Sequence, residues 1–477
     1  MIDVGTFYEN SEPIVSMVQS VSLSNETFRL DGQFYILFDN PANVTYKVSK
    51  YKTLQKCCSE IYEVPLFKHI YVEEGEGVPF YTSSGLFEAD LTPSHYLSPL
   101  IPNLERYRIK KGQILMARSG NVEAGILGQI IMAGNFLHNK TTSDHIIRFT
   151  PNENEIHQGY LCAFLMSDWC RGELLKNAAG AVIPAIRPES LSEIKIPFPE
   201  NIIQSAIGDK ILLAVSLREQ ANEQLNEANH LIHEYNHLPP LNISDAEYYD
   251  KGKEIQTRIL KSSTISGEYR LDAHFYNPIA ELAIKNVIRY SSRNKPLREL
   301  TSDVFMGDRF ARNYVSDNYG LPFLSGKHLI QIRPETKFIS ISETNDIDGL
   351  RVKKGWILIT RSGTLGRVGF IWNNYETYTA TEDVIRVVPL ESEIDNGYLY
   401  AFLSSEYGYQ QIIRYKHGAV VDHIAPEQVD LVLVPIPKSP QQQEIIGDKV
   451  RLAYEKRAEA IRLEDEAQDI LKQSLAG

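Results

Sequence analysis

Short apolar runs enclosed by turn residues recur along the chain and predict β-strands. Such runs lie at 114–117, 145–149, 357–360 and 383–388. Gly-Tyr-Leu-x-Ala-Phe-Leu at 159–165 and at 397–403 predicts two helices, while 194–199 and 432–437 each predict a short strand closed by prolines. Strands and helices mixed in this order predict an α/β fold made of mixed α+β lobes.

Two longer segments carry a heptad pattern, in which apolar or small residues alternate at four- and three-residue spacing. The positions are Ile207, Ile211, Ala214, Arg218, Ala221, Leu225, Ala228, Ile232 and Tyr235, and then Ile446, Val450, Ala453, Arg457, Ala460, Glu464, Ala467 and Leu471. Alanines in such a seam let two backbones approach closely. We therefore expect two helices of about 35 residues, each about 50 Å long, to form a coiled-coil spacer. Two lone amphipathic helices are the alternative.

The whole pattern occurs twice. Arg-Leu-Asp-x-x-Phe-Tyr occupies 29–35 and 270–276, Lys-Lys-Gly-x-Ile-Leu-x-x-Arg-Ser-Gly occupies 110–120 and 353–363, and Ile-Gly-Asp-Lys occupies 207–210 and 446–449. The order is preserved, and the offsets (270 − 29 = 241, 353 − 110 = 243, 446 − 207 = 239) barely drift. This is a duplicated unit of about 240 residues, longer than a solenoid repeat, and it predicts pseudo-twofold symmetry.

The duplication predicts six segments. They are an N-terminal extension (1–27), a first lobe (28–200), a first spacer helix (201–237), a linker (238–268), a second lobe (269–438) and a second spacer helix (439–477). The linker is recognised by Pro239-Pro240 and by the run Ser262-Ser263-Thr264.

The net charge of −12, from 49 basic and 61 acidic residues, is at first sight unfavourable for binding nucleic acid. The lobes themselves are nearly neutral. Residues 28–200 hold 17 basic and 19 acidic side chains, and residues 269–438 hold 20 of each. A basic cleft is compatible with this balance, but without a broad basic patch we expect the isolated chain to bind DNA weakly.

Several classes of protein find no support in the sequence. No apolar run approaches the roughly 20 residues that span a bilayer, and Met1 to Gly5 does not open a secretory signal. Cys57, Cys58, Cys162 and Cys170 form no CxxC pair, so we expect free thiols, no metal site and a cytoplasmic protein. The sequence contains no Asn-Pro-Pro-Tyr run, no GxGxxG, no P-loop and no HExxH, so we expect no catalytic residues.

The plan of lobe, long helix, second lobe and second long helix resembles the specificity subunit of type I restriction–modification systems. The Arg-Leu-Asp and Lys-Lys-Gly motifs, the closing prolines and Gln441-Gln442-Gln443 at the start of the last helix are similar to that family too. The resemblance covers residues 28–477. The chain departs from the family at 203–206, which lacks the glutamine-rich opening of a helix.

The resemblance implies a non-catalytic subunit for phage defence, in which each lobe reads half of a split site in double-stranded DNA. The helices would hold the lobes apart and dock two methyltransferase subunits, whose cofactor would be S-adenosylmethionine, and a restriction subunit could join them. Arg218, Leu225, Ile232, Arg457 and Leu471 could belong either to the helix seam or to this docking surface. A stand-alone DNA-binding regulator and an enzyme with an unrecognised site are the alternatives.

Candidate DNA contacts follow from comparing the two lobes. Arg118-Ser119 and Arg361-Ser362 are shared, so contact with phosphate or a role in the fold is favoured for them over reading bases. Lys110 and Lys111 either meet phosphates or form an ordinary basic turn. Bases should be read where the lobes differ, and solvated loops are the alternative there. These candidates are Ser83 and Ser84 in the first lobe and Arg309, Arg312, Asn313, Lys327, His328, Thr364 and Arg367 in the second.

Overall fold

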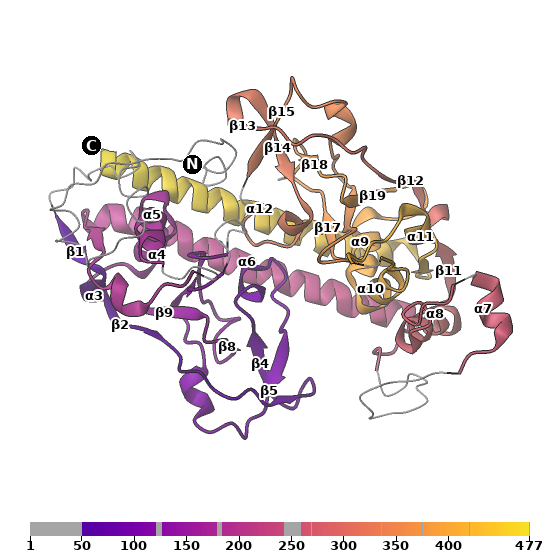
Figure 1. Cartoon of the computed structure of the whole chain (residues 1–477), viewed down its shortest axis with the longest axis horizontal. Helices are drawn as coiled ribbons and strands as arrows, with labels where there is room; N and C mark the ends of the chain where they lie inside the picture. Colours follow the sequence, from indigo (N-terminus) through magenta and orange to yellow (C-terminus); the bar gives the residue numbers. More distant parts are fainter. Residues whose placement is uncertain are drawn as a thin grey trace. The chain divides into compact units, whose positions relative to one another are not determined.

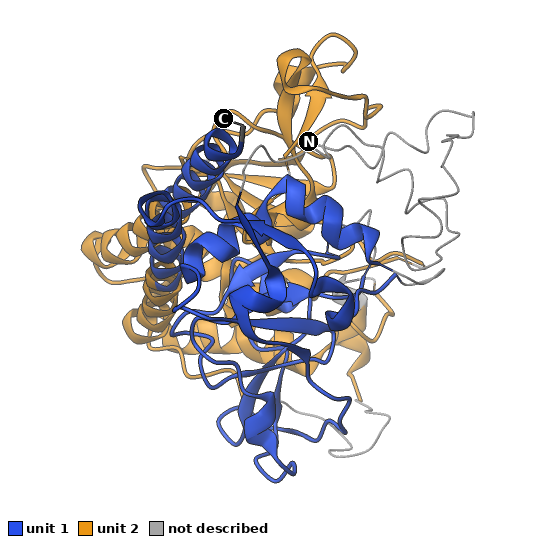
Figure 2. Ribbon diagram, turned by 90° about the vertical axis from the view of Figure 1, so that its left-hand side faces the viewer, with its two compact units in different colours: residues 1–219, 459–477 blue, residues 220–458 orange. Residues whose placement is uncertain are grey.

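The computed structural model describes residues 50–120, 126–178, 184–242, 259–268, 270–334, 336–373, 375–418 and 420–476. The chain divides into two compact units, residues 1–219 with 459–477 and residues 220–458 (Figure 2). Each unit therefore contains one lobe and one stretch of both long helices. The predicted extension 1–27 and the first Arg-Leu-Asp motif at 29–35 lie outside the described residues.

The lobe of the first unit is built on two four-stranded sheets (Figure 1). The antiparallel sheet β2-β9-β6-β7 consists of Cys58–Glu63, Ile146–Pro151, Ile114–Ala117 and Ile130–Met132. The sheet β3-β5-β4-β8 consists of Tyr71–Val72, His95–Leu97, Val78–Tyr81 and Thr141–Thr142, and we call it the distal sheet. The remaining elements are the pair β1 (Tyr51–Thr53) and β10 (Lys195–Pro197), the helices α3 (Leu54–Cys57), α4 (Gln158–Met166) and α5 (Asp168–Lys176), and 3-10 turns at Gly85–Phe87, Leu104–Tyr107 and Pro188–Leu191.

The lobe of the second unit repeats this topology strand for strand. The sheet β12-β19-β16-β17 consists of Thr301–Met306, Val384–Pro389, Ile357–Thr360 and Val368–Phe370, and its distal sheet β13-β15-β14-β18 consists of Tyr314–Val315, Lys337–Ser340, Gly320–Leu324 and Thr379–Ala380. The other elements are β11 (Arg293–Pro296) paired with β20 (Leu433–Ile436), α7 (Ser262–Glu268), α8 (Pro278–Tyr290), α9 (Asn396–Ser404), α10 (Glu406–Ile413), α11 (Pro426–Val429), and 3-10 turns at Leu297–Glu299, Asp317–Tyr319, Gly326–Leu329 and Ile347–Leu350. The predicted fold class, two duplicated α/β lobes, is confirmed.

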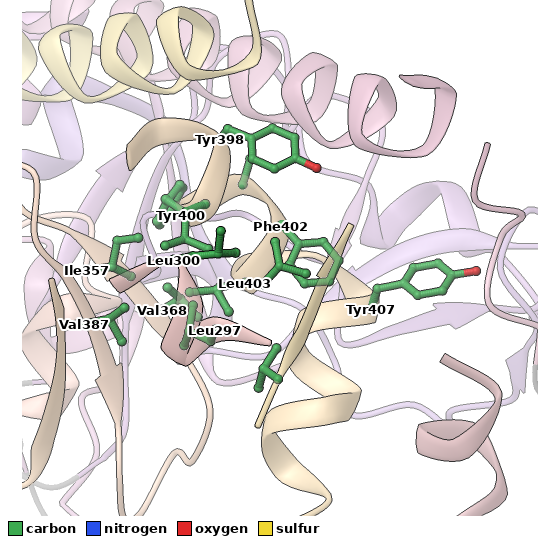
Figure 3. Packing of buried hydrophobic residues seen from close by; sticks show 14 of the residues in the cluster. Leu297, Leu300, Ile357, Val368, Val387, Tyr398, Tyr400, Phe402, Leu403 and Tyr407 are labelled. Atoms are coloured by element: carbon green, nitrogen blue, oxygen red, sulfur yellow. The ribbon is translucent and has the colours of Figure 1, made fainter. Parts of the chain in front are cut away.

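The predicted strands form the centre of each lobe because both of their faces are covered. All four residues of β6 and of β16 are buried, as expected for a continuous apolar run. Figure 3 shows Tyr400, Phe402 and Leu403 of α9 gathered with Ile357 and Val387 of the sheet. The helix is tied to the closing strand in both lobes, since Tyr160 Oη donates to the carbonyl of Pro197 (2.8 Å) and Tyr398 Oη to that of Pro435 (2.6 Å).

One fully buried arginine crosses the core of each lobe. Arg148 on β9 donates to the carbonyls of Tyr107 and Arg108, both at 2.8 Å. Arg386 on β19 donates to the carbonyl of Ala380 at 2.8 Å and to that of Leu350 at 3.3 Å. Burial lowers the pKa of both guanidinium groups, that of Arg386 to about 10. Through these hydrogen bonds to loop carbonyls, the two arginines fix the loops beside the distal sheet onto the central sheet.

The two long helices, α6 (Asn201–Asn236) and α12 (Pro440–Ala476), pack on each other with opposite directions. In the first unit, the start of α6 meets the end of α12, and in the second unit the end of α6 meets the start of α12. The buried seam residues are Ile207, Ile211, Ala214, Ala460, Ala467 and Leu471 in the first unit, and Ala228, Ile232, Ile446 and Val450 in the second. The predicted packing of helix on helix is confirmed.

Polar seam residues pair with each other within each unit. Arg218 forms a two-pronged ion pair with Glu464, in which Nη2 lies 2.8 Å from Oε2, and Glu464 is only 3% exposed. Arg457, at the position equivalent to Arg218, donates to Oδ1 of Asn222 at 2.9 Å. Since an unpaired buried charge is costly, these two contacts favour one register of the helices.

The structure decides between the two roles that the sequence left open for five helix residues. Ile232 and Leu471 are completely buried, and Leu225 packs against the core of the second unit. Arg218 and Arg457 point into the seam as described above. All five residues therefore belong to the helix seam or the core beneath it.

Each lobe is fastened to its helix by a contact between two glycines, which we call the joint. Gly159 at the start of α4 lies against Gly208 of α6, and Gly397 at the start of α9 lies against Gly447 of α12. A Cβ on Gly397 would lie 2.7 Å from the Cα of Gly447, and one on Gly159 would lie 2.9 Å from the Cα of Gly208. The repeated Ile-Gly-Asp-Lys motif is thus explained by the close crossing of two backbones.

The same glutamine secures both joints. Oε1 of Gln204 accepts from the backbone N–H of His157 (3.2 Å), and Oε1 of Gln443 accepts from that of Asp395 (3.1 Å). Gln204 and Gln443 occupy equivalent positions, 239 residues apart. The segment 203–206 therefore lacks the glutamine-rich sequence of the family but keeps Gln204, the one glutamine that contacts the joint.

Candidate nucleic-acid interface

The shared Arg-Ser-Gly motif follows the central strands β6 and β16 and has the same backbone surroundings in both lobes. The N–H of Arg118 donates to the carbonyl of His145, and its carbonyl accepts from Ile186. The N–H of Arg361 donates to the carbonyl of Asp383, and its carbonyl accepts from Ile424. The motif therefore holds together three segments of the lobe, which supports the structural role considered for it.

The two arginine side chains are also occupied by carboxylates. Arg118 forms an ion pair with Glu63 at the end of β2, and Nη1 of Arg361 lies 3.6 Å from Oδ1 of Asp383. About a fifth of each side chain is exposed, 23% for Arg118 and 19% for Arg361. A phosphate contact would have to compete with these carboxylates, and for both arginines it stays a prediction. The adjacent Ser119 Oγ lies 2.7 Å from Nδ1 of His145, and Ser362 forms a β-bridge with His423.

The second lobe brings two of its predicted residues, Arg312 and Arg361, to one place, the start of β19. Nη2 of Arg312 lies 3.0 Å from Oε1 of Glu382 and 3.8 Å from Oδ2 of Asp383, the carboxylate that also faces Arg361. Burial alone would raise the pKa of Glu382, but hydrogen bonds from the backbone, Arg312 and Thr381 outweigh it and lower that pKa. Two arginines and two carboxylates thus form one ionised cluster, which we call the β19 cluster.

The other predicted readers of the second lobe are dispersed. Arg309, Asn313 and Lys327 are exposed in loops of the distal sheet. His328 is only 2% exposed, and its Nδ1 accepts from the backbone N–H of Ser325 in the capping box of the turn Gly326–Leu329. Burial lowers the pKa of His328 to about 4, so its ring is neutral near pH 7. In this conformation His328 is buried and stabilises the turn Gly326–Leu329.

Two further candidates lie in the turn between β16 and β17. Thr364 is exposed, while its carbonyl accepts a hydrogen bond from Oγ1 of Thr360. The same Oγ1 accepts from the N–H of Arg367 at 2.9 Å, and Gly363 and Gly366 adopt positive φ angles of 67° and 79°. The turn is therefore tightly fixed. Its first-lobe counterpart, residues 121–125, lies outside the described residues.

The serine and lysine candidates are on the surface. Ser84 is exposed and Ser83 partly so; Ser84 Oγ lies 3.3 Å from Oγ1 of Thr82. Lys110 and Lys111 are exposed in their turn, which leaves both readings of them open. Their counterpart Lys354 lies 3.3 Å from Oε1 of Glu376.

A further shared feature was missed by the sequence comparison. Tyr71 at the start of β3 and Tyr314 at the start of β13 are both about half exposed, at 47% and 45%. Their rings lie 6.2 Å from that of Phe80 and 6.3 Å from that of Phe323, at equivalent places in the two distal sheets. The repeated spacing Phe67 to Tyr71 and Phe310 to Tyr314 was the signal that could have revealed it.

The described residues contain no group of three or more His, Cys, Asp or Glu side chains placed to hold a metal ion. The four cysteines are buried free thiols, and burial raises the pKa of Cys57 to about 11 and that of Cys58 to about 12. Both groups are therefore protonated near pH 7 and poor nucleophiles. Among the helices of the described part of the chain, none is long and apolar enough to cross a membrane.

Comparison with known families gives two matches to one model, the type I restriction modification DNA specificity domain. The matches cover residues 60–227 and 296–449, one for each lobe with part of its helix. The comparison with curated proteins found no match.

Among solved structures, the chain is similar to the type I restriction–modification system S subunit from M. genitalium. The identity is 17%, the match covers 91% of this chain and 96% of that one, and the TM-score is 0.37. It is also similar to the HsdS subunit from Thermoanaerobacter tengcongensis, at 15% identity over 91% of this chain and 99% of that one, with a TM-score of 0.29.

Proposed function

Since the chain belongs to the type I restriction–modification DNA specificity family, we propose that it reads a bipartite site in double-stranded DNA and docks methyltransferase subunits. Recognition of DNA sequence is the role of the family, and the chain is a non-catalytic subunit. The stand-alone regulator remains the second candidate, because the family match describes a DNA specificity domain and does not by itself require a partner.

The duplication of one lobe on two equivalent joints carries the proposal. Both lobes have the same strand order, and each is fixed to a long helix through a pair of glycines. The residues of the two lobes differ where side chains reach the surface, as the exposed Ser84 and Lys327 illustrate at equivalent positions. Two similar lobes with different surfaces are suited to read two different short words separated by unread base pairs.

The low net charge of the two lobes is the reason to expect partner subunits. Non-specific attraction to phosphate supplies much of the affinity of DNA-binding proteins, whereas these lobes carry −2 and 0 over residues 28–200 and 269–438. We therefore assign the missing affinity, together with S-adenosylmethionine and the methyl transfer, to two methyltransferase subunits docked on the two pseudo-equivalent helices. A restriction subunit would join this complex.

The test is to measure binding and methylation with and without a co-expressed methyltransferase subunit of a type I system. We expect a complex of two methyltransferase subunits per chain by light scattering. Methylation and tight site-specific binding in gel-shift assays should appear only in that complex. Nanomolar specific binding by the isolated chain at physiological salt, with no stable complex, would favour the regulator instead.

Exchanging the first lobe, residues 28–200, for the first lobe of another family member is expected to change one half of the methylated site and to leave the other half intact. The reason is that each lobe is an independent copy with its own core. Sequencing of methylated sites from the chimeric complex measures this. A change in both halves would contradict the modular reading.

A further inference from the structure

One pair of equivalent residues combines an identical backbone setting with different chemistry. His145 and Asp383 are the residues immediately before the central strands β9 and β19. Each carbonyl accepts a hydrogen bond from the arginine of the Arg-Ser-Gly motif, at 3.0 Å from Arg118 and 3.1 Å from Arg361. The fold thus places both Cα atoms in the same way and leaves the side chain free to vary.

The side chains at this position face solvent and polar neighbours in both lobes. His145 is exposed, and its Nδ1 lies 2.7 Å from Oγ of Ser119. The side chain of Asp383 is 41% exposed and lies between Arg361 and Arg312, at 3.6 and 3.8 Å. A position needed only for folding would be expected to keep one chemistry in both copies, because its backbone partners are the same.

The two chemistries correspond to different base edges. A carboxylate accepts hydrogen bonds only and matches the N4 amino group of cytosine, while arginine donates two bonds to O6 and N7 of guanine. The β19 cluster holds both kinds of group against each other. Opening its ion pairs toward DNA would offer Asp383 to a cytosine, and Arg312, the more exposed of the two arginines, to the guanine paired with it.

We propose that His145 and Asp383 are base-reading residues, and that the β19 cluster selects a C·G base pair in the word read by the second lobe. In the first lobe, the tautomer of His145 in which Nδ1 accepts from Ser119 carries its N–H on Nε2, which can donate to N7 or O6 of guanine. This inference rests on the proposed function, since it assigns a contact to each of the two half-sites.

The test uses the complete complex of this chain with its methyltransferase and S-adenosylmethionine, and it sequences the methylated sites. For D383N we expect the preference at one base pair of one half-site to move from C·G toward A·T by about ten-fold or more, because an amide pairs with adenine instead. H145D should alter one base pair of the other half-site only. The two variants are independent, so a folding defect in one leaves the claim open to refutation by the other.

E391Q is the matched control, because Glu391 is an exposed carboxylate just beyond the opposite end of β19 and should leave the methylated site unchanged. If D383N or H145D is assembled and active and methylates the wild-type site with unchanged preference, the base-reading role is wrong although the proposed function stands. If the wild-type complex methylates no two-part site, the proposed function itself fails.

Discussion

Inserting seven residues into both long helices, after Ala221 and after Ala460, is expected to lengthen the unread spacer of the DNA site by about three base pairs. Seven helical residues add about 10 Å, and a base pair occupies about 3.4 Å. One heptad preserves the seam, because the buried positions repeat at that interval. Because α6 and α12 run in opposite directions, lengthening both by the same amount keeps the pair Arg218–Glu464 on one side of the insertions and the pair Lys449–Glu227 on the other.

Sequencing of methylated sites should then show loss of the wild-type site and methylation of the same two words at the longer spacing. The control is the same insertion in α6 alone. It shifts the part of α6 after Ala221 by seven residues against α12, so the pairs Arg218–Glu464 and Lys449–Glu227 cannot both be kept, and it should give a misassembled protein. Two correctly assembled helices with an unchanged spacer would show that the helices do not set the distance between the words.

Much of this architecture could be predicted because it depends on local apolar patterns. The runs 114–117 and 357–360 are strands with those bounds, β6 and β16. The predicted strands 145–149 and 383–388 are β9 and β19, each of which includes its terminal proline. Strands buried on both faces need a continuous apolar segment, and long helices need a sustained seam, so both features are visible in one sequence.

The distal sheets could not be predicted in this way. Strands such as β3 and β13 have two residues each, too few to show an alternating pattern. Their position depends on pairing with residues more than twenty positions away, as between Tyr71 and Leu97. The buried arginines Arg148 and Arg386 were equally hidden, because their carbonyl acceptors are brought to them only by the fold.

The candidate site was predictable in part, and the reason for the limit is electrostatic. The sequence identified Arg312 and Arg361 as cations but could not place Glu382 and Asp383 against them. That placement turns two free cations into a nearly neutral cluster. His328 was identified as a polar loop residue, whereas the turn Gly326–Leu329 folds its ring inward. The sequence therefore identified the chemical type of these side chains, but not whether they are exposed, paired or buried.

The sequence also could not predict whether the two long helices pair in parallel or antiparallel; this was seen only in the structure. Both seams have the same spacing, and a heptad pattern alone is compatible with parallel or antiparallel pairing. The polar residues distinguish the two. Arg218 meets Glu464 near the end of α12, while Lys449 near its start meets Glu227 at 2.8 Å. Because the helices pair antiparallel, each helix contributes to both units, and each lobe therefore packs against parts of both helices.

Substituting Gly159 by alanine is expected to destabilise the first unit by about 3 kcal/mol, because overpacking that requires the backbone to move costs about this much. The added methyl group would overlap the backbone of Gly208, whose Cα would lie only 2.9 Å away. Unlike a side chain, a backbone cannot adopt another rotamer to relieve the clash. The direction of the stability change is informative, because in a helix without this contact alanine would be more favourable than glycine by about 1 kcal/mol. The thermal unfolding midpoint of the purified chain measures the change.

Gly172→Ala is the matched control for this prediction. Gly172 lies in α5 of the same lobe, and apart from its chain neighbours and the backbone of its own helix, no heavy atom of the described residues lies within 4 Å of the place that its Cβ would take. Here only the helix propensity changes, so the midpoint should rise slightly. If Gly159→Ala also raised the midpoint, the glycine contact would not be a close crossing of backbones. The joint would then have to be explained by the glutamine and capping contacts alone.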